Sequence, residues 1–250
     1  NGYGIVLVSS GAVGAGMEAL GYQKRPTRLE ELQACAAVGQ SKLMALYQEL
    51  FAAHSLQVAQ VLLTHSDLED HDRHLNARNT LIALLERGVI PVINENDTVS
   101  FTELTVGDND KLSALVSALL PADLLVLLTT ADGLVRDYGK RDAKLISTVR
   151  KIDATTKKFA GGTQSATSIG GMATKLEAAK IVVRAGIPMV IANGRVRGML
   201  SNILARKNVG TLFLPRADRL KSRKRWIAFF HRPKGVLVVD EGAKTALRER

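Results

Sequence analysis

The chain is poor in cysteine and in aromatic residues, and it contains no long apolar run. Cys35 is its single cysteine, so no intrachain disulfide is possible, and its apolar neighbours predict a small buried side chain. Aromatic residues make up 4% of the sequence, so Val, Leu, Ile and Ala must fill most of the core. The longest apolar runs, such as Leu124–Leu128, fall short of the roughly 20 residues of a membrane helix. We therefore expect a cytoplasmic protein without a membrane partner.

An initiator methionine and a signal-peptide pattern are also lacking. The sequence opens on Asn1-Gly2-Tyr3-Gly4 and continues at once into the apolar residues Ile5–Val8. This opening predicts that the sequence begins inside a domain.

Negative charge is in the minority, and the positive excess is unevenly distributed. The formal net charge is +10, and six basic residues fall between Arg216 and Arg225. Such a run is a candidate contact for nucleic acid, but an exposed linker explains it more simply. We do not expect RNA binding from this part of the chain.

Short apolar runs alternate with longer segments of helical period. The predicted strands are Ile5–Val8, Val58–Leu63, Val89–Ile93, Leu124–Leu128, Met189–Ala192 and Thr211–Leu214. The predicted helices are Leu29–Ala53, Arg73–Glu86, Lys111–Leu119, Ala173–Ala185 and Met199–Ala205. This alternation predicts an α/β fold with an open, mainly parallel sheet sandwiched between helices. A short β-rich piece follows Pro215.

Polar or glycine-rich segments follow four of the predicted strands. They begin at Ser9, Asn94, Thr129 and Asn193. Ligands of open parallel sheets bind beyond the carboxyl ends of the strands, so this common placement predicts a site at one edge of the sheet.

Two of these segments each allow two interpretations. Ser10-Gly11 forms a strand-to-helix turn that suits an approaching anion, but Ser10 also suits an ordinary helix cap. The run Asn94-Glu95-Asn96-Asp97 could hold an ammonium group or Mg²⁺, or it could be a polar turn. Four such residues in succession exceed what a turn needs, so a binding role is favoured there.

Two predicted helix starts carry charged residues that suit phosphate chemistry. Asp108-Asn109-Asp110 could organise Mg²⁺ and lysines, although capping alone would explain the aspartates. Gly170–Lys175 offers glycines for close phosphate approach, and Lys175 opposes the helix dipole, which indicates a bound anion. The alternative is a lysine after a flexible loop; in either case we expect it to be exposed in a cleft.

The spacing of His71 and His74 fits two metal ligands on one helix face, but the surrounding acidic residues favour a solvated loop and helix start. The sequence contains no Gly-x-Ser-x-Gly motif, which would have indicated a hydrolase.

Taken in order, these segments resemble the glutamate 5-kinase family of the amino-acid kinase superfamily. The matching stretches cover essentially the whole chain and include Val8–Ala12, Leu75–Arg78, Pro91–Asp97, Val106–Asp110, Leu112–Ala114 and Gly170–Leu176. Arg223–Ile227 resembles the family's connection to a C-terminal PUA domain, and Asp240–Ala243 resembles the opening of that domain. The resemblance implies an amino-acid kinase domain at 1–215 lacking its first strand, a basic linker at 216–226 and a partial PUA-like segment at 227–250.

The resemblance implies transfer of the γ-phosphoryl group of ATP to the side-chain carboxylate of L-glutamate, the first step of proline biosynthesis. It further implies Mg²⁺, a homo-oligomer and feedback inhibition by proline. The residues that would bind glutamate are Ser10, Gly11, Asn94, Asp97 and Asn109. Those that would bind the nucleotide are Thr129, Thr130, Gly170, Gly171, Met172, Ala173, Thr174 and Lys175.

The same resemblance assigns catalytic roles to three residues. Lys175 would neutralise charge on the transferred phosphoryl group, while Asp108 and Asp110 would orient lysine and metal. No metal ligand is assigned.

Two positions depart from the family pattern. Thr130 stands where an Asp is usual and Ile169 where a Thr is usual. The family's opening strand, whose lysine contacts the phosphates, has no counterpart in the sequence. Three alternatives therefore stay open: another amino-acid kinase such as an acetylglutamate, aspartate or uridylate kinase, a non-catalytic binder of glutamate, proline or nucleotide, and an RNA-binding protein that uses the basic run.

Overall fold

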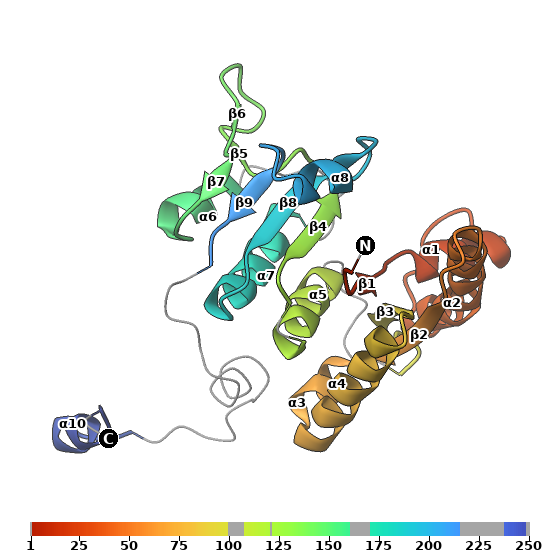
Figure 1. The fold of residues 1–250 in the computed structure, drawn as a ribbon, viewed down its shortest axis with the longest axis horizontal. Helices are drawn as coiled ribbons and strands as arrows, with labels where there is room; N and C mark the ends of the chain where they lie inside the picture. The colour runs from red at the N-terminus through yellow and green to blue at the C-terminus, as the bar shows by residue number, and fades with distance from the viewer. Residues whose placement is uncertain (1, 100–107, 121, 161–170, 216–237, 249–250) are drawn as a thin grey trace.

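The computed structural model describes residues 2–99, 108–120, 122–160, 171–215 and 238–248 (Figure 1). The predictions for Ile169, Gly170 and the basic linker 216–226 lie outside these residues, as does the side chain of Asp108. No helix of the described ranges is long and apolar enough to cross a membrane.

The strands form two sheets and one separate pair. Their bounds are β1 (Leu7–Val8), β2 (Val58–Leu63), β3 (Ile90–Glu95), β4 (Leu125–Thr129), β5 (Val135–Arg136), β6 (Lys144–Leu145), β7 (Thr148–Val149), β8 (Met189–Asn193) and β9 (Thr211–Phe213). The first sheet has the order β1-β3-β2 and is parallel throughout. The second has the order β4-β8-β9-β7, in which only the β8–β9 pairing is antiparallel. The pair β5–β6 is antiparallel.

The helices of the described residues are α1 (Ala12–Ala19), α2 (Leu29–Ala52), α3 (His65–Glu69), α4 (His71–Glu86), α5 (Asp108–Leu119), α6 (Ala154–Ala160), α7 (Met172–Arg184), α8 (Met199–Leu204) and α10 (Glu241–Arg248). Of these, α2, α4, α5, α7 and α8 contact strands of the two sheets. Figure 1 shows α1 and α2 side by side at one end, next to the first sheet. Helix α5 contacts α7 and also the strands β1, β3 and β4, so it bridges the two sheets.

One apolar core runs through both sheets. It contains Ile93 of β3, Leu112 of α5 and Ile191 of β8, all of them inaccessible to solvent. Strand β3 is buried along its whole length, which explains why Ile90–Ile93 is a continuous apolar run rather than an alternating one.

The predicted α/β fold with mainly parallel strands between helices is confirmed. The predicted long strands and helices are all present, with ends that move by a few residues. The predicted strands belong to two hydrogen-bonded sheets, of three and four strands, and not to one continuous sheet. The C-terminal piece, predicted to be β-rich, has one described element, the helix α10, and its residues 216–237 lie outside the described residues.

The predicted elements do not include the short helices α3 and α6 or the two-residue strands β5, β6 and β7. Helix α1 is the helix expected after the Ser10-Gly11 turn, but its extent was not predicted. Helix α1 contains Gly14 and Gly16, which read as turn residues in a sequence, but Gly16 lies directly against the backbone of α2. Close packing between helices, which has no local sequence signal, determines that glycine.

Candidate functional site

A cluster of amide and hydroxyl groups forms where β1 and β3 end. Asn109, in the first turn of α5, places its Nδ2 2.8 Å from the carbonyl oxygen of Ser9, 2.7 Å from Ser10 Oγ and 3.1 Å from Asn94 Oδ1. Residues almost 100 positions apart thus meet at the carboxyl edge of the first sheet. The structure therefore brings together three of the predicted acceptor-site residues.

A third amide, on helix α2, belongs to this cluster and was not predicted. Asn94 is 2% exposed, and its Nδ2 donates to Oε1 of Gln40 on α2 at 2.9 Å. Gln40 carries no sequence signal, because it is one glutamine within a 24-residue helix. We call Ser10, Gln40, Asn94 and Asn109 the amide cluster.

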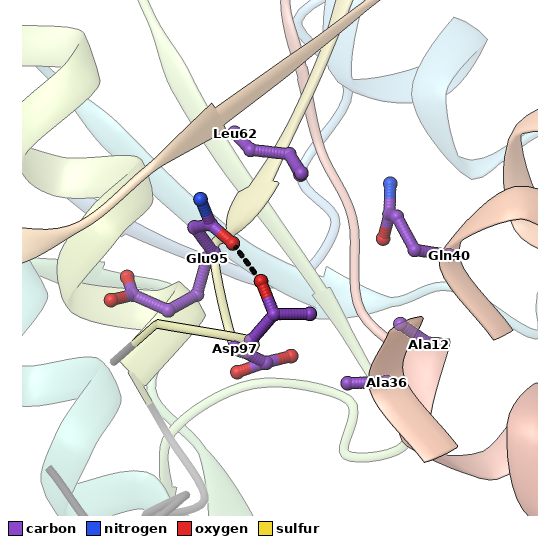
Figure 2. Close-up of a pocket in the computed structure, with 8 residues that line it drawn as sticks. Ala12, Ala36, Gln40, Leu62, Glu95 and Asp97 are labelled. Carbon is purple, nitrogen blue, oxygen red and sulfur yellow. Dashed lines mark hydrogen bonds between the residues drawn. The ribbon is translucent and has the colours of Figure 1, made fainter. Parts of the chain in front are cut away.

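Beside the amide cluster lies a small pocket (Figure 2). Its lining comes from α1, α2, the end of β2 and the segment after β3, namely Ala12, Ala36, Gln40, Leu62, Glu95, Asn96, Asp97 and Thr98. The Asn96 N–H donates to the carbonyl oxygen of Leu63 at 3.0 Å, which fixes the segment that carries half-buried Asp97. Figure 2 shows Asp97 facing the two alanines across the pocket. Gly11, at the other rim of the cluster, has φ of 107°, a left-handed value that favours glycine.

Charged residues gather at the first turns of α5 and α7. Lys175 Nζ lies 3.0 Å from Asp110 Oδ2, and Thr174 Oγ1 donates to the same oxygen at 2.7 Å. We call Asp110, Thr174 and Lys175 the charge cluster. The expectation of an exposed lysine was wrong, since the side chain of Lys175 is 14% exposed and that of Asp110 15%. Packing of α5 against α7 encloses the pair.

The two clusters are joined through the backbone of α5. Asn109 belongs to the amide cluster, and the next residue, Asp110, belongs to the charge cluster. A molecule held by the amide cluster would therefore lie next to the Lys175 cation and the Thr174 hydroxyl of the charge cluster.

The remaining predicted nucleotide residues are placed as follows. Gly171 is the N-cap of α7 and has no side-chain cap, so the first N–H groups of the helix receive no capping side chain there. Met172 is buried in the core, so only its backbone is available to a ligand, while Ala173 is exposed. Thr129 ends β4 and its carbonyl accepts from the Gly194 N–H at 2.8 Å, and Thr130 beside it is exposed.

Two further ionisable residues meet at the pocket: Glu95, which belongs to the run with a predicted binding role, and His65, for which no such role was predicted. Glu95, 6% exposed, places its Oε2 3.6 Å from Nδ1 of His65 at the start of α3. That oxygen and His65 Nε2 have no hydrogen-bond partner among the described residues. The pairing depends on β2 and β3 being neighbours, which one sequence does not reveal.

The side chains of His71 and His74 lie in different environments, although both belong to α4. His71 is exposed and His74 is buried, with its Nδ1 3.2 Å from the carbonyl oxygen of Leu68. In the part of the chain that the structure describes, no three His, Cys, Asp or Glu side chains come close enough to hold a metal.

Comparison with known proteins identifies the family. The sequence model of the amino acid kinase family matches residues 1–193. The chain belongs to the amino acid kinase family.

Within this family, the chain is similar to glutamate 5-kinases. The chain is 49% identical over 245 residues to the glutamate 5-kinase of Moorella thermoacetica, covering 97% of this chain and 65% of that protein. It is 48% identical over 251 residues to the glutamate 5-kinase of Photobacterium profundum, covering 100% of this chain and 66% of that protein. The chain thus spans just under two thirds of the length of these relatives.

Solved structures agree on the fold. The carbamate kinase from Giardia lamblia bound to AMP-PNP superposes with a TM-score of 0.60 at 17% identity, over 86% of this chain and 84% of that chain. The isopentenyl phosphate kinase of T. acidophilum gives 0.54 at 16% identity, over 84% and 83%. At such identities the likeness shows the amino acid kinase fold alone.

Proposed function

We propose that this chain transfers the γ-phosphoryl group of ATP to the side-chain carboxylate of L-glutamate, giving γ-glutamyl phosphate. The observation that supports it most directly is the junction on α5, where Asn109 serves the amide cluster and Asp110 the charge cluster. The glutamate 5-kinase relatives at 48–49% identity point to the same reaction. The reaction would supply the first step of proline biosynthesis.

The acceptor side of this proposal uses the amide cluster and the pocket. Ser10, Gly11, Asn94 and Asn109 would offer hydroxyl, backbone and amide groups to the acceptor. Asp97 would pair with the ammonium group of glutamate, because a half-buried carboxylate attracts a cation more strongly than one in bulk water.

The donor side uses the start of α7 and the end of β4. Gly170, Gly171, Met172 and Ala173 would approach the phosphates through their backbone, with Thr174 and Lys175 beside them, and Thr129 and Thr130 would contact the nucleotide. Lys175 would stabilise charge on the transferred group, and Asp110 would hold Lys175 in position. Positioning and electrostatic stabilisation are most of what phosphoryl transfer requires of a protein.

Mg²⁺ fits this arrangement as a companion of the nucleotide. Asp110 Oδ2 already accepts from Thr174 and Lys175, and the described residues form no metal site of their own. Mg²⁺ commonly binds through one or two carboxylates together with substrate phosphates. Asp108 and Asp110, at the start of α5, would supply those carboxylates, and the ion would neutralise phosphate charge.

The wider proposals follow from the resemblance to the glutamate 5-kinase family. We expect a cytoplasmic homo-oligomer inhibited by proline. We also expect the kinase domain to occupy 1–215, followed by a basic linker at 216–226 and a partial PUA-like segment at 227–250. The family match to residues 1–193 supports the first of these ranges.

The proposed function is tested by trapping the acyl phosphate as its hydroxamate. The protein at its full natural length is incubated with ATP, Mg²⁺ and hydroxylamine, with glutamate, N-acetylglutamate and aspartate in turn, and ADP release is followed with UMP. Hydroxamate from glutamate alone is expected. A preference for another acceptor would reassign the chain within its family, and no turnover with any acceptor, but retained glutamate binding, would favour a non-catalytic binding protein.

A further inference from the structure

The amide cluster leaves one buried donor without a partner. Gln40 is 8% exposed, and its Nε2 has no hydrogen-bond partner among the described residues. An unsatisfied buried polar atom costs about 1–3 kcal/mol, so its retention beside a pocket calls for a ligand that it can bind.

The orientation of Gln40 is determined by backbone groups. The Glu95 N–H donates to Asn94 Oδ1 at 3.0 Å, so Asn94 must turn its Nδ2 toward Gln40. Gln40 then accepts through Oε1 at 2.9 Å, and its Nε2 is left pointing away from Asn94. The hydrogen-bond network therefore determines which end of the Gln40 amide is the free donor, Nε2, and the assignment does not depend on an arbitrary choice of amide orientation.

The other end of the network is anchored in the same way. Asn109 Nδ2 donates to the carbonyl oxygen of Ser9 at 2.8 Å, which leaves Asn109 Oδ1 buried and without a partner in the described part of the chain. The cluster thus presents an unmatched donor at Gln40 and an unmatched acceptor at Asn109. Such a pair complements a ligand that carries both an anionic and a cationic group.

The position of Gln40 indicates which group it meets. Two amides, Asn94 and Asn109, lie between Gln40 and the charge cluster that begins at Asp110. The group at Gln40 is therefore the one furthest from the phosphoryl group. In Figure 2, Gln40 lies on the side of the pocket that carries Ala12 and Ala36, across from Glu95, with its amide oxygen nearer the alanines in this view and its Nε2 turned away from them. A carboxylate oxygen on the Nε2 side of Gln40 would accept from this donor.

We propose that Gln40 is a specificity-determining residue that donates from Nε2 to the α-carboxylate of the acceptor amino acid, while its Oε1 orients Asn94. This inference rests on the proposed function, because it takes glutamate as the acceptor. It adds a residue of α2 to a site otherwise built from β1, β3 and α5.

The test compares Gln40→Glu with Gln48→Glu. Gln40→Glu keeps an oxygen for Asn94 and replaces the donor by a negative oxygen, while Gln48 makes the same change at an exposed position of the same helix. A hydrogen bond to a charged group contributes about 1.5–3 kcal/mol, so Gln40→Glu should raise the KM for glutamate about 10- to 150-fold. The KM for ATP should stay unchanged. A second variant, Gln40→Met, gives the same comparison without an added charge if Gln40→Glu does not fold.

Isoglutamine, in which the α-carboxylate is an amide, separates a direct contact from a structural role. Wild-type protein should use glutamate at least about 10-fold better than isoglutamine, and this preference should disappear in Gln40→Glu. Loss of stability alone would change both substrates equally. The inference is overturned if Gln40→Glu and Gln40→Met both prefer glutamate over isoglutamine as strongly as Gln48→Glu does. The proposed function would then remain unaffected.

Calorimetric titration with glutamate keeps the two proposals distinguishable. If wild-type protein binds glutamate without phosphorylating it, and Gln40→Glu weakens that binding while Gln48→Glu does not, the proposed function fails and the role of Gln40 stands. If wild-type protein does not bind glutamate, both are overturned.

Discussion

At the scale of single residues, the pairing of Lys175 with Asp110 is the most informative contact of the site. A lysine in the first turn of a helix is unfavourable for the dipole, and here the ion pair compensates that cost while it is largely withdrawn from solvent. Asp110 is held in turn by Thr174. Lys175 is therefore fixed before any nucleotide binds, and a fixed charge needs no reorganisation during the reaction.

Lys175→Met should lower kcat for hydroxamate formation by about 10²–10³, the usual loss for one preorganised electrostatic contact. Because the Asp110 carboxylate then keeps Thr174 alone as a side-chain partner among the described residues, the free energy of unfolding should also fall by about 1–3 kcal/mol. Steady-state kinetics and urea denaturation measure the two effects.

The matched control for this change is Lys180→Met. Lys180 lies on the same helix and pairs with Glu177 at the surface, where ion pairs contribute less than about 1 kcal/mol. It should leave kcat unchanged. Equal activity of the two variants would remove Lys175 from the reaction.

Asp97→Asn should raise the KM for glutamate by about 10- to 100-fold, because an amide cannot pair with the ammonium group as a carboxylate does. The KM for ATP should be unaffected, since Asp97 lines the acceptor pocket. Initial rates with each substrate varied in turn provide the measurement. Asp123→Asn, at an exposed position, is the control, and an unaltered KM in Asp97→Asn would contradict the assignment.

The site residues that could be predicted are those that follow strands. Ser10 and Asn94 stand directly after apolar runs, so topology places them at one edge of the sheet. Gln40 and His65 join them only through tertiary contacts. A residue in the middle of a helix or at the start of a short one has no local sequence pattern that marks it as functional, so its role becomes visible only in three dimensions.

At the scale of elements, the contact between α1 and α2 positions the acceptor side of the site. A Cβ on Gly39 would lie 1.7 Å from the carbonyl oxygen of Ala12, and one on Gly16 would lie 1.7 Å from that of Cys35. The two helices therefore touch backbone to backbone. Gln40 follows Gly39 directly, and the Ser10-Gly11 turn precedes α1, so this contact holds both in register.

Gly39→Ala should reduce the free energy of unfolding by about 1–3 kcal/mol or more, because the added methyl group overlaps backbone atoms that can move only if the helices separate. The KM for glutamate should rise as Gln40 is displaced. Urea denaturation and acceptor kinetics test both expectations.

Gly14→Ala is the control on the neighbouring helix. Among the described residues, no atom apart from the nearby backbone of α1 itself lies within 4 Å of a Cβ at Gly14, and Ala is favoured over Gly in a helix by about 0.5–1 kcal/mol. That variant should be as stable as wild-type protein or more so. A Gly39→Ala protein of undiminished stability would show that the helices are not held by this contact.

Long elements were predictable and short ones were not. Strand β3 and helices α2 and α5 have enough residues for a clear apolar run or helical period. The two-residue strands β5, β6 and β7 are paired with other short strands, and α1 packs against α2 through Gly16. Tertiary contact determines these elements, and a local pattern cannot reveal it.

At the scale of the whole molecule, α5 connects the two sheets by packing against strands of both. Its apolar face contributes Leu112, Leu115 and Leu119 to the core, and its first turn carries Asn109 and Asp110. The same helix that joins the sheets thus joins the acceptor and donor sides of the site. Any relative movement of the sheets would change the distance between the acceptor and the phosphoryl group.

The stability of this assembly should depend on pH through His74. Burial lowers the pKa of His74 below its ordinary value of 6.5, and the charges of His71 and Arg78 lower it further, against the opposing hydrogen bond with the carbonyl oxygen of Leu68. The unfolded chain therefore binds a proton at a higher pH than the folded chain. Folding is favoured above about pH 6.5 and loses free energy as the pH falls below it.

The free energy of unfolding of wild-type protein should accordingly fall toward acid from about pH 6.5, with a slope from this one group of at most about 1.4 kcal/mol per pH unit. His74→Gln cannot take up the proton, so it should lose this part of the slope while being less stable at neutral pH. His71→Gln, at an exposed site one turn away, should keep the slope. Urea denaturation between pH 5 and about 8 gives the three curves, and parallel curves for wild-type and His74→Gln protein would show that His74 is not held neutral by the fold.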